Sequence, residues 1–207
     1  MKFFTVNNKK YSKIISPYCD LENGPWVAGG SVRKIWEGKP WQNQDIDFFF
    51  KNPNQYSRLR ERIGEFGQLN NSVYETQNAS SFTININPIA DKRLRHEFDL
   101  LEDKLPKEDL IKIQLICKQW YTSALDVINN FDLGISQFIT DGNTIIASDQ
   151  AVQDHADRAI RVGKNYLGKI NPLRVVKYAA YGYDPDPDLF LSCLQTAIQD
   201  GVNDDSY

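Results

Sequence analysis

The sequence predicts an α+β fold followed by a small helical appendage, and two observations carry this prediction. Through about residue 148, short apolar segments typical of strands alternate with segments typical of helices. After residue 149, only helical patterns follow. These patterns predict a head domain at 1–148 and a helical neck at 149–200, and the acidic end at 201–207 is expected to be a disordered tail.

The predicted strands share β-branched and aromatic residues and end at turn residues. The alternation is strictest in 82–86, and Asp141-Gly142 is a turn signal before the last strand. Residues 96–101 are also strand-like, within a charged segment at 88–108 that we interpret as a hairpin or insertion. The remaining strands are expected at 25–28, 45–50, 73–76, 111–117, 131–139 and 144–147.

The predicted helices of the head lie between these strands. The clearest is 53–66, where Tyr56, Leu59, Ile63 and Phe66 recur at helical spacing. The others are expected at 9–18, 31–37 and 123–129.

Composition limits the classes of protein that fit. The chain has 207 residues, of which 41% are hydrophobic, enough for the core of one ordinary domain. It has no apolar run that could span a bilayer and no signal peptide, and its three widely spaced cysteines fit a reducing, cytoplasmic setting without a membrane partner. The net charge of -3 argues against binding duplex DNA by charge alone.

Two carboxylates lie on one predicted strand. Side chains at i and i+2 leave the same face of a strand, so Asp45 and Asp47 are expected to converge while Ile46 turns into the core. Two adjacent carboxylates repel each other, and a divalent cation between them removes the repulsion. Mg²⁺ fits best, because it takes oxygen ligands and shares its coordination shell with phosphates. Two such ions could assist an in-line displacement at phosphorus.

A glycine turn precedes this strand. Residues 25–28 are expected to form a strand, Gly29-Gly30 a tight turn, and Ser31 the start of a helix that carries Arg33. Backbone N–H groups in such a turn point outward, and a triphosphate can accept their hydrogen bonds. Glycine lets the backbone come close enough to the phosphates.

Each part alone also has an ordinary structural explanation. Asp-x-Asp occurs at solvated strand ends, Gly-Gly in plain turns, and a helical arginine on most surfaces. The specific signal is their conjunction: strand, Gly29-Gly30, helix with Arg33, the turn Gly38-Lys39-Pro40 and the Asp-x-Asp strand follow in this order.

This stretch resembles the head domain of class II tRNA nucleotidyltransferases and bacterial poly(A) polymerases. The resemblance implies a mixed nucleotidyltransferase sheet, expected here to have five to seven strands and flanking helices. It also implies Mg²⁺ dependence, with two ions expected, binding of ATP or another NTP, and addition of nucleotides to a tRNA-like RNA 3′ end. By this resemblance Gly29, Gly30, Ser31 and Arg33 bind the triphosphate, and Asp45 and Asp47 ligate the metal.

Two later segments extend the resemblance. The segment 127–133 lies where the family has an aspartate that reaches the nucleotide sugar, which implies a catalytic and nucleotide-binding role for Asp132; the alternative is a strand-start or cap residue. The segment 170–183 resembles the family's Glu-Asp-x-x-Arg helix, which implies that Arg174 faces the base of the nucleotide; the alternative is an exposed helix arginine. Asn171 stands in the place of the template aspartate and could bind a base edge with altered selectivity.

The chain also departs from the family. The third metal carboxylate is Asp99 if the strand beside Asp-x-Asp is 96–101, whereas the neutral Gln114 takes that position if the strand is 111–117. The long helical body that grips RNA in the family does not follow, so RNA recognition would be minimal, supplied by a homodimer, or absent.

Three functions remain open on the sequence. The first is a Mg²⁺-dependent nucleotidyltransferase that acts on an RNA 3′ end. The second is a nucleotidyltransferase that modifies a protein or a small molecule. The third is a catalytically silent nucleotide-binding protein, which Gln114 and Asn171 favour and the Asp45/Asp47 pair opposes.

Overall fold

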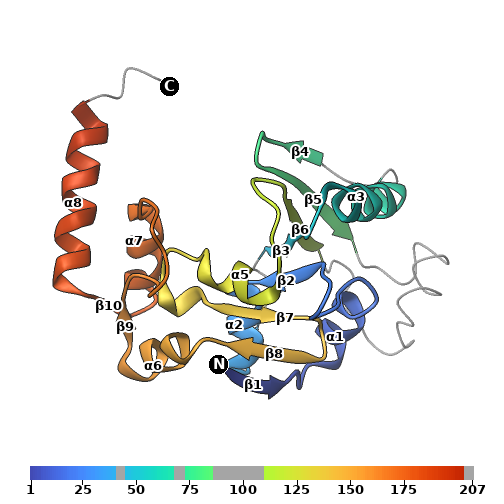
Figure 1. Cartoon of the computed structure of the whole chain (residues 1–207), viewed down its shortest axis with the longest axis horizontal. Coiled ribbons are helices and arrows are strands. Elements are labelled where there is room, and N and C mark those ends of the chain that lie inside the picture. Colours follow the sequence, from blue (N-terminus) through green and yellow to red (C-terminus); the bar gives the residue numbers. More distant parts are fainter. Residues whose placement is uncertain (41–44, 68–72, 86–109, 203–207) are drawn as a thin grey trace. The chain divides into compact units, whose positions relative to one another are not determined.

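A computed structural model describes residues 1–40, 45–67, 73–85 and 110–202 (Figure 1). The chain forms two compact units. Unit 1 comprises residues 1–2, 128–137 and 147–207, and unit 2 comprises residues 3–127 and 138–146. The predicted strand at 96–101, with Asp99, and most of the predicted tail lie outside the described residues.

A mixed sheet forms the core of unit 2. Its order is β1-β8-β7-β2-β3-β6-β5-β4. Strand β3 pairs with β6 in parallel and with β2 antiparallel, so the sheet is mixed. The strands are β1 (Lys2–Thr5), β2 (Trp26–Ala28), β3 (Ile46–Phe49), β4 (Val73–Glu75), β5 (Ala79–Asn85), β6 (Leu110–Ile116), β7 (Phe138–Thr140) and β8 (Thr144–Ala147).

The predicted α+β class and mixed sheet are confirmed, but the strand number was wrong. Within the described residues the sheet has eight strands instead of five to seven. The extra strand is β1, a four-residue edge strand whose side chains are mostly exposed. Such a strand shows no apolar alternation, because neither of its faces is fully buried.

Central strands β2 and β3 carry the deepest part of the core. All three residues of β2 are fully buried, and Ile46 and Phe48 of β3 are at most 1% exposed. Helices accompany the sheet: α1 (Lys9–Ile15), α2 (Gly30–Trp36), α3 (Pro53–Gly67) and α5 (Ala124–Asn129). Helix α3 packs against β5, and α2 contacts β2, β3 and β7 (Figure 1). The buried centre therefore fixes β3, which carries Asp47.

The strand expected at 131–139 is shorter than predicted. Only β7 extends there, and Leu133 makes an isolated bridge to Val162 before a short 3-10 turn, η1 (Gly134–Ser136). Gly134 lies so close to α6 (Asp149–Asp157) that an added Cβ would come within 2.3 Å of Asp154 Oδ2. Such a close approach of the Gly134 backbone to α6 fits a turn better than a continuous strand.

Unit 1 is built from helices and one small sheet. Besides α6 it contains β9 (Ala159–Ile160), α7 (Pro172–Ala180), β10 (Asp184–Pro185) and α8 (Pro187–Val202), with β9 and β10 paired in parallel. Its core joins Leu133 and Ile135 to Val175, Tyr178 and Leu189. The segment 128–137 is thus part of this core, although it is far from the helices in sequence.

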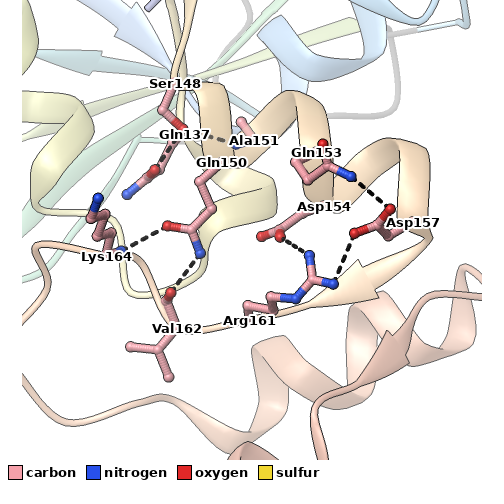
Figure 2. A network of polar contacts seen from close by, with 10 residues as sticks. All are labelled: Gln137, Ser148, Gln150, Ala151, Gln153, Asp154, Asp157, Arg161, Val162 and Lys164. Carbon is pink, nitrogen blue, oxygen red and sulfur yellow. Dashed lines mark hydrogen bonds and ion pairs between the residues drawn. The ribbon is translucent and has the colours of Figure 1, made fainter.

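A polar network holds the segment after β9 against α6 (Figure 2). Arg161 donates to the fully buried Asp154 and to Asp157, both at 2.8 Å. The side chain of Gln150 donates to the Val162 carbonyl and accepts from the Lys164 N–H. Burial raises the pKa of Asp154, and the hydrogen bond from Arg161 lowers it in part.

Among the helices that the structure describes, none combines the length and the apolar character needed to cross a bilayer.

Candidate functional site

The turn after β2 has a backbone that favours glycine. Gly29 adopts φ 88° and ψ −139°, a region that side chains with a Cβ rarely enter. Its N–H donates to the Phe138 carbonyl at 2.8 Å, and its carbonyl accepts from the Arg33 N–H at 3.0 Å. Helix α2 therefore begins directly at Gly30. With only seven residues it has a small dipole, so any phosphate binding here would depend on the turn's own N–H groups.

Ser31 is fully buried at the start of α2 and contacts a residue that the sequence did not single out. The hydroxyls of Ser31 and Tyr11 are 3.4 Å apart. Burial raises the pKa of Tyr11, the Ser31 contact lowers it, and the charges of Cys19 and Asp47 raise it further. The only signal in the sequence was that Tyr11 falls in a predicted helix.

Arg33 is held by a buried carboxylate. Its side chain is 2% exposed, and its guanidinium forms an ion pair with Glu37 one turn later in α2. Glu37 is equally buried and also binds Lys39, whose Nζ lies 2.9 Å from Glu37 Oε2. Lys39 is 55% exposed. Of this trio, Lys39 presents its charge most fully to solvent.

Asp45, Asp47 and Gln114 gather on one face of the sheet. In the β3–β6 register, Asp47 lies opposite Gln114, and directly paired residues point to the same face. Gln114 Nε2 donates to Asp45 Oδ2 at 3.1 Å. Two segments, 96–101 and 111–117, were candidates for the strand beside the Asp-x-Asp strand. Within the described residues β6 occupies this position, and it brings Gln114 next to Asp47.

This pair of carboxylates fits a magnesium ion that draws its other ligands from a substrate. In the part of the chain that the structure describes, no cluster of three or more His, Cys, Asp or Glu could hold a metal by itself. Mg²⁺ commonly binds through one or two carboxylates together with phosphate oxygens and water. Asp45 and Asp47 supply that number of carboxylates.

The remaining predicted residues lie in unit 1, and two of them meet. Arg174 Nη1 donates to Oδ1 of the buried Asp132 at 2.7 Å, although 42 residues separate them. The Arg174 side chain is 49% exposed. Asn171 caps α7: its Oδ1 accepts from the Leu173 N–H at 3.0 Å. Asp132 also raises the pKa of Cys193, after the larger effect of burial.

The predicted site residues thus fall into two groups. Gly29, Gly30, Ser31, Arg33, Asp45 and Asp47 lie in unit 2, whereas Asp132, Asn171 and Arg174 lie in unit 1. Within unit 2 the structure joins Asp45 to Gln114, and within unit 1 it joins Asp132 to Arg174. The ligand roles predicted for all of these residues stay predictions.

Solved structures similar to this chain include CCA-adding enzymes. One is the Thermotoga maritima CCA-adding enzyme complexed with tRNA, with a TM-score of 0.53 and 13% identity over 96% of this chain and 47% of that one. Another is a CCA-adding enzyme with ATP, with a TM-score of 0.52 and 15% identity over 100% of this chain and 49% of that one. The chain therefore has a nucleotidyltransferase fold and spans about half the length of these enzymes.

The sequence itself points to a different family from the one expected. No protein with a curated description matches it. A family model described as Gabija anti-defense 2 (Gad2) family protein matches residues 3–158. The expected class II tRNA nucleotidyltransferase and poly(A) polymerase family is therefore supported at the level of the fold only. This chain belongs to the Gabija anti-defense 2 family.

Proposed function

We propose that this protein is a Mg²⁺-dependent nucleotidyltransferase that transfers an NMP from an NTP to an acceptor hydroxyl, with an RNA 3′ end as the first acceptor class. The observation that carries the proposal is the placement of Asp45, Asp47 and Gln114 on one face of β3 and β6. The fold of the CCA-adding enzymes supports it.

In this proposal each group of residues has a task. Asp45 and Asp47 hold Mg²⁺, which when bound neutralises negative charge on the phosphates. The N–H groups of Gly30 and Ser31 bind the triphosphate, with Arg33 nearby in α2, while Gly29, whose own N–H donates to the Phe138 carbonyl, shapes the turn. The Gln114 amide orients Asp45 through its hydrogen bond.

The nucleotide-binding roles predicted for residues of unit 1 are proposed for that unit by itself. Asp132 and Arg174 would bind the sugar and the base edge of a nucleotide as a hydrogen-bonded pair. Asn171 uses its side-chain oxygen to cap α7, so it would contribute to base recognition through its amide N–H₂.

A second candidate acceptor is a protein or a small molecule. The name of the family favours it, since an anti-defense protein could act by modifying a component of the defense that it opposes. The chemistry at Asp45 and Asp47 is the same for both acceptors, because each offers a hydroxyl to the α-phosphorus. The acceptor therefore has to be identified by experiment.

The test is a transfer assay with the full chain, Mg²⁺ and each labelled NTP in turn, offered total RNA or total protein. We expect label in RNA, and expect Asp45→Ala/Asp47→Ala to reduce it by at least about a hundredfold. Glu61→Ala, which removes an exposed carboxylate from α3, is the matched control and should transfer normally.

Other outcomes of this assay separate the candidates. Label in protein or in a small molecule that depends on the two aspartates would favour the second acceptor class. NTP binding without transfer to any acceptor would indicate the catalytically silent protein and would contradict the proposal.

A further inference from the structure

A polar strip crosses the sheet beside the two carboxylates, and its residues have no part in the proposed function. It consists of Tyr74 of β4, Ser81 and Thr83 of β5, and Lys112 of β6. Ser81 pairs with Gln114 on one side and with Tyr74 on the other, and Thr83 pairs with Lys112. Because Ser81 and Thr83 are two residues apart, the whole strip shares the face of Gln114.

The strip lines a pocket that opens beside Asp45. The pocket has a volume of about 200 Å³, and its lining joins the strip to Asp45, Gln114 and Phe82. Phe82 is 3% exposed, whereas Tyr74 is 68% exposed. The Lys112 side chain is exposed as well. The pocket thus offers a cation, two hydroxyls and an open aromatic ring close to one of the proposed metal-binding carboxylates.

Strand order places this pocket on one side of β3 and the glycine turn on the other. The turn follows β2, which flanks β3 on one side, whereas β6, β5 and β4 follow on the opposite side. In an in-line displacement the attacking oxygen and the leaving group lie on opposite sides of the phosphorus. If the Gly29-Gly30 turn holds the departing phosphates, the acceptor approaches over β6 and β5.

We propose that this pocket binds the acceptor, and that the acceptor is a nucleotide whose ribose hydroxyl lies at Asp45 while its phosphate contacts Lys112, Ser81 and Thr83. The inference rests on the nucleotidyl transfer proposed above. Ammonium and hydroxyl donors suit phosphate oxygens, and an exposed tyrosine ring suits stacking on a base. Strands β6 and β5 lie about 5 and 10 Å from β3, a span that one nucleotide can bridge.

Transfer to such an acceptor forms one bond at phosphorus and breaks another. The ribose oxygen forms a bond to the α-phosphorus of the NTP, the bond from that phosphorus to the oxygen of the β-phosphate breaks, and pyrophosphate leaves. The hydroxyl proton passes to solvent water. Lys112 does not take part in the bond changes and acts by holding the acceptor.

Binding to the full chain without NTP tests the pocket directly. The probes are AMP, adenosine and a short single-stranded oligoribonucleotide, titrated by calorimetry against wild type, Lys112→Gln and Tyr74→Ala. We expect Lys112→Gln to weaken AMP about tenfold, as the loss of one charge-assisted hydrogen bond does, and to leave adenosine and NTP affinity unchanged. Tyr74→Ala should weaken AMP and adenosine alike. The matched control is Lys118→Gln, an exposed lysine just beyond β6.

The probes also identify the source of the phosphate. Lys112-dependent binding of the oligoribonucleotide supports an RNA end, and Lys112-dependent binding of AMP alone supports a free nucleotide. Wild-type affinity of Lys112→Gln for both phosphate probes, or no binding of either probe to wild type, overturns the inference.

Failure of this inference is distinguishable from failure of the proposed function. Lys112-dependent binding without any NMP transfer overturns nucleotidyl transfer and leaves the pocket in place. Transfer that continues in Lys112→Gln with an unchanged KM for the acceptor overturns the pocket and leaves nucleotidyl transfer in place.

Discussion

The substitution Gln114→Glu tests whether the face around Asp45 is built for a cation. Gln114 now donates its amide hydrogen to Asp45 Oδ2 at 3.1 Å. A glutamate at this position removes the donor and places a negative charge beside the Asp45 carboxylate, with Asp47 on the same face. We therefore expect the variant to be less stable than wild type without Mg²⁺ and to regain stability when Mg²⁺ is added.

The size of the effect follows from this geometry. Two unit charges 4 Å apart repel by about 1 kcal/mol in water and by about 4 kcal/mol at an effective dielectric constant near 20. Asp45 and Gln114 are both half-buried, so an intermediate value applies. With about 1 kcal/mol for the lost hydrogen bond, the expected loss at pH 7 is about 3 kcal/mol. In a domain of this size that lowers Tm by roughly 6 to 12 °C.

Thermal unfolding at several pH values, with and without Mg²⁺, measures the loss of stability in Gln114→Glu and its recovery. Mg²⁺ at ten times its Kd should restore about 1.4 kcal/mol. Lowering the pH should also recover stability, because one of the crowded carboxylates then takes up a proton and the repulsion ends. Gln77→Glu adds the same charge at the exposed β4–β5 turn and is the matched control, with little change expected under any condition.

Two results would refute the reasoning. If Gln114→Glu is as stable as wild type at pH 7 without Mg²⁺, the two side chains do not face each other. If the variant is destabilised but Mg²⁺ raises its Tm no more than it raises that of Gln77→Glu, the carboxylates do not converge on a cation.

Three further substitutions test the local geometry. Gly29→Ala forces a Cβ onto φ 88°, ψ −139°, so urea denaturation should show a loss of about 1 to 3 kcal/mol and NTP binding should weaken; wild-type stability would contradict the backbone described. Gly134→Ala brings a Cβ within 2.3 Å of Asp154 Oδ2 and should lower the free energy of unfolding by about 3 kcal/mol in the same assay. Adding Asp154→Ala to this variant should relieve part of the loss. If the stability losses of the two substitutions simply add, the clash is contradicted. Burial raises the pKa of Asp154, so its contribution to stability is greatest below the unfolded value near 3.9 and is lost as pH rises through the raised folded value. Wild type should therefore gain stability relative to Asp154→Asn as pH falls from neutrality, and parallel stability curves would contradict the shift.

Local patterns in the sequence were sufficient to predict the placement of side chains where that placement is set within one strand or one turn. The alternation of β3 predicts that Asp45 and Asp47 share a face, and the β3–β6 register with the Gln114 hydrogen bond agrees with this. The glycine turn was also predictable, because its dihedral angles depend on residues adjacent in the chain. The α+β class followed from the order of strands and helices.

Contacts between distant segments could not be predicted in the same way. Two segments looked like strands, and the pairing of β6 with β3 depends on packing across the whole sheet rather than on either segment. The Asp132–Arg174 ion pair joins residues 42 apart, for which a single sequence gives no signal. The Arg33–Glu37 ion pair was different, because its i,i+4 spacing in a predicted helix was a sequence signal from which the pair could have been predicted.

The way the chain divides between its two units limits where it can be cut. It passes from one unit to the other between residues 2 and 3, 127 and 128, 137 and 138, and 146 and 147. A shortened chain that ends at residue 148 would keep Leu133 and Ile135 but lose Val175, Tyr178 and Leu189, against which they are buried. Such a fragment would expose apolar side chains to water and should aggregate, so the sheet unit of this protein has to be studied with its helical unit attached.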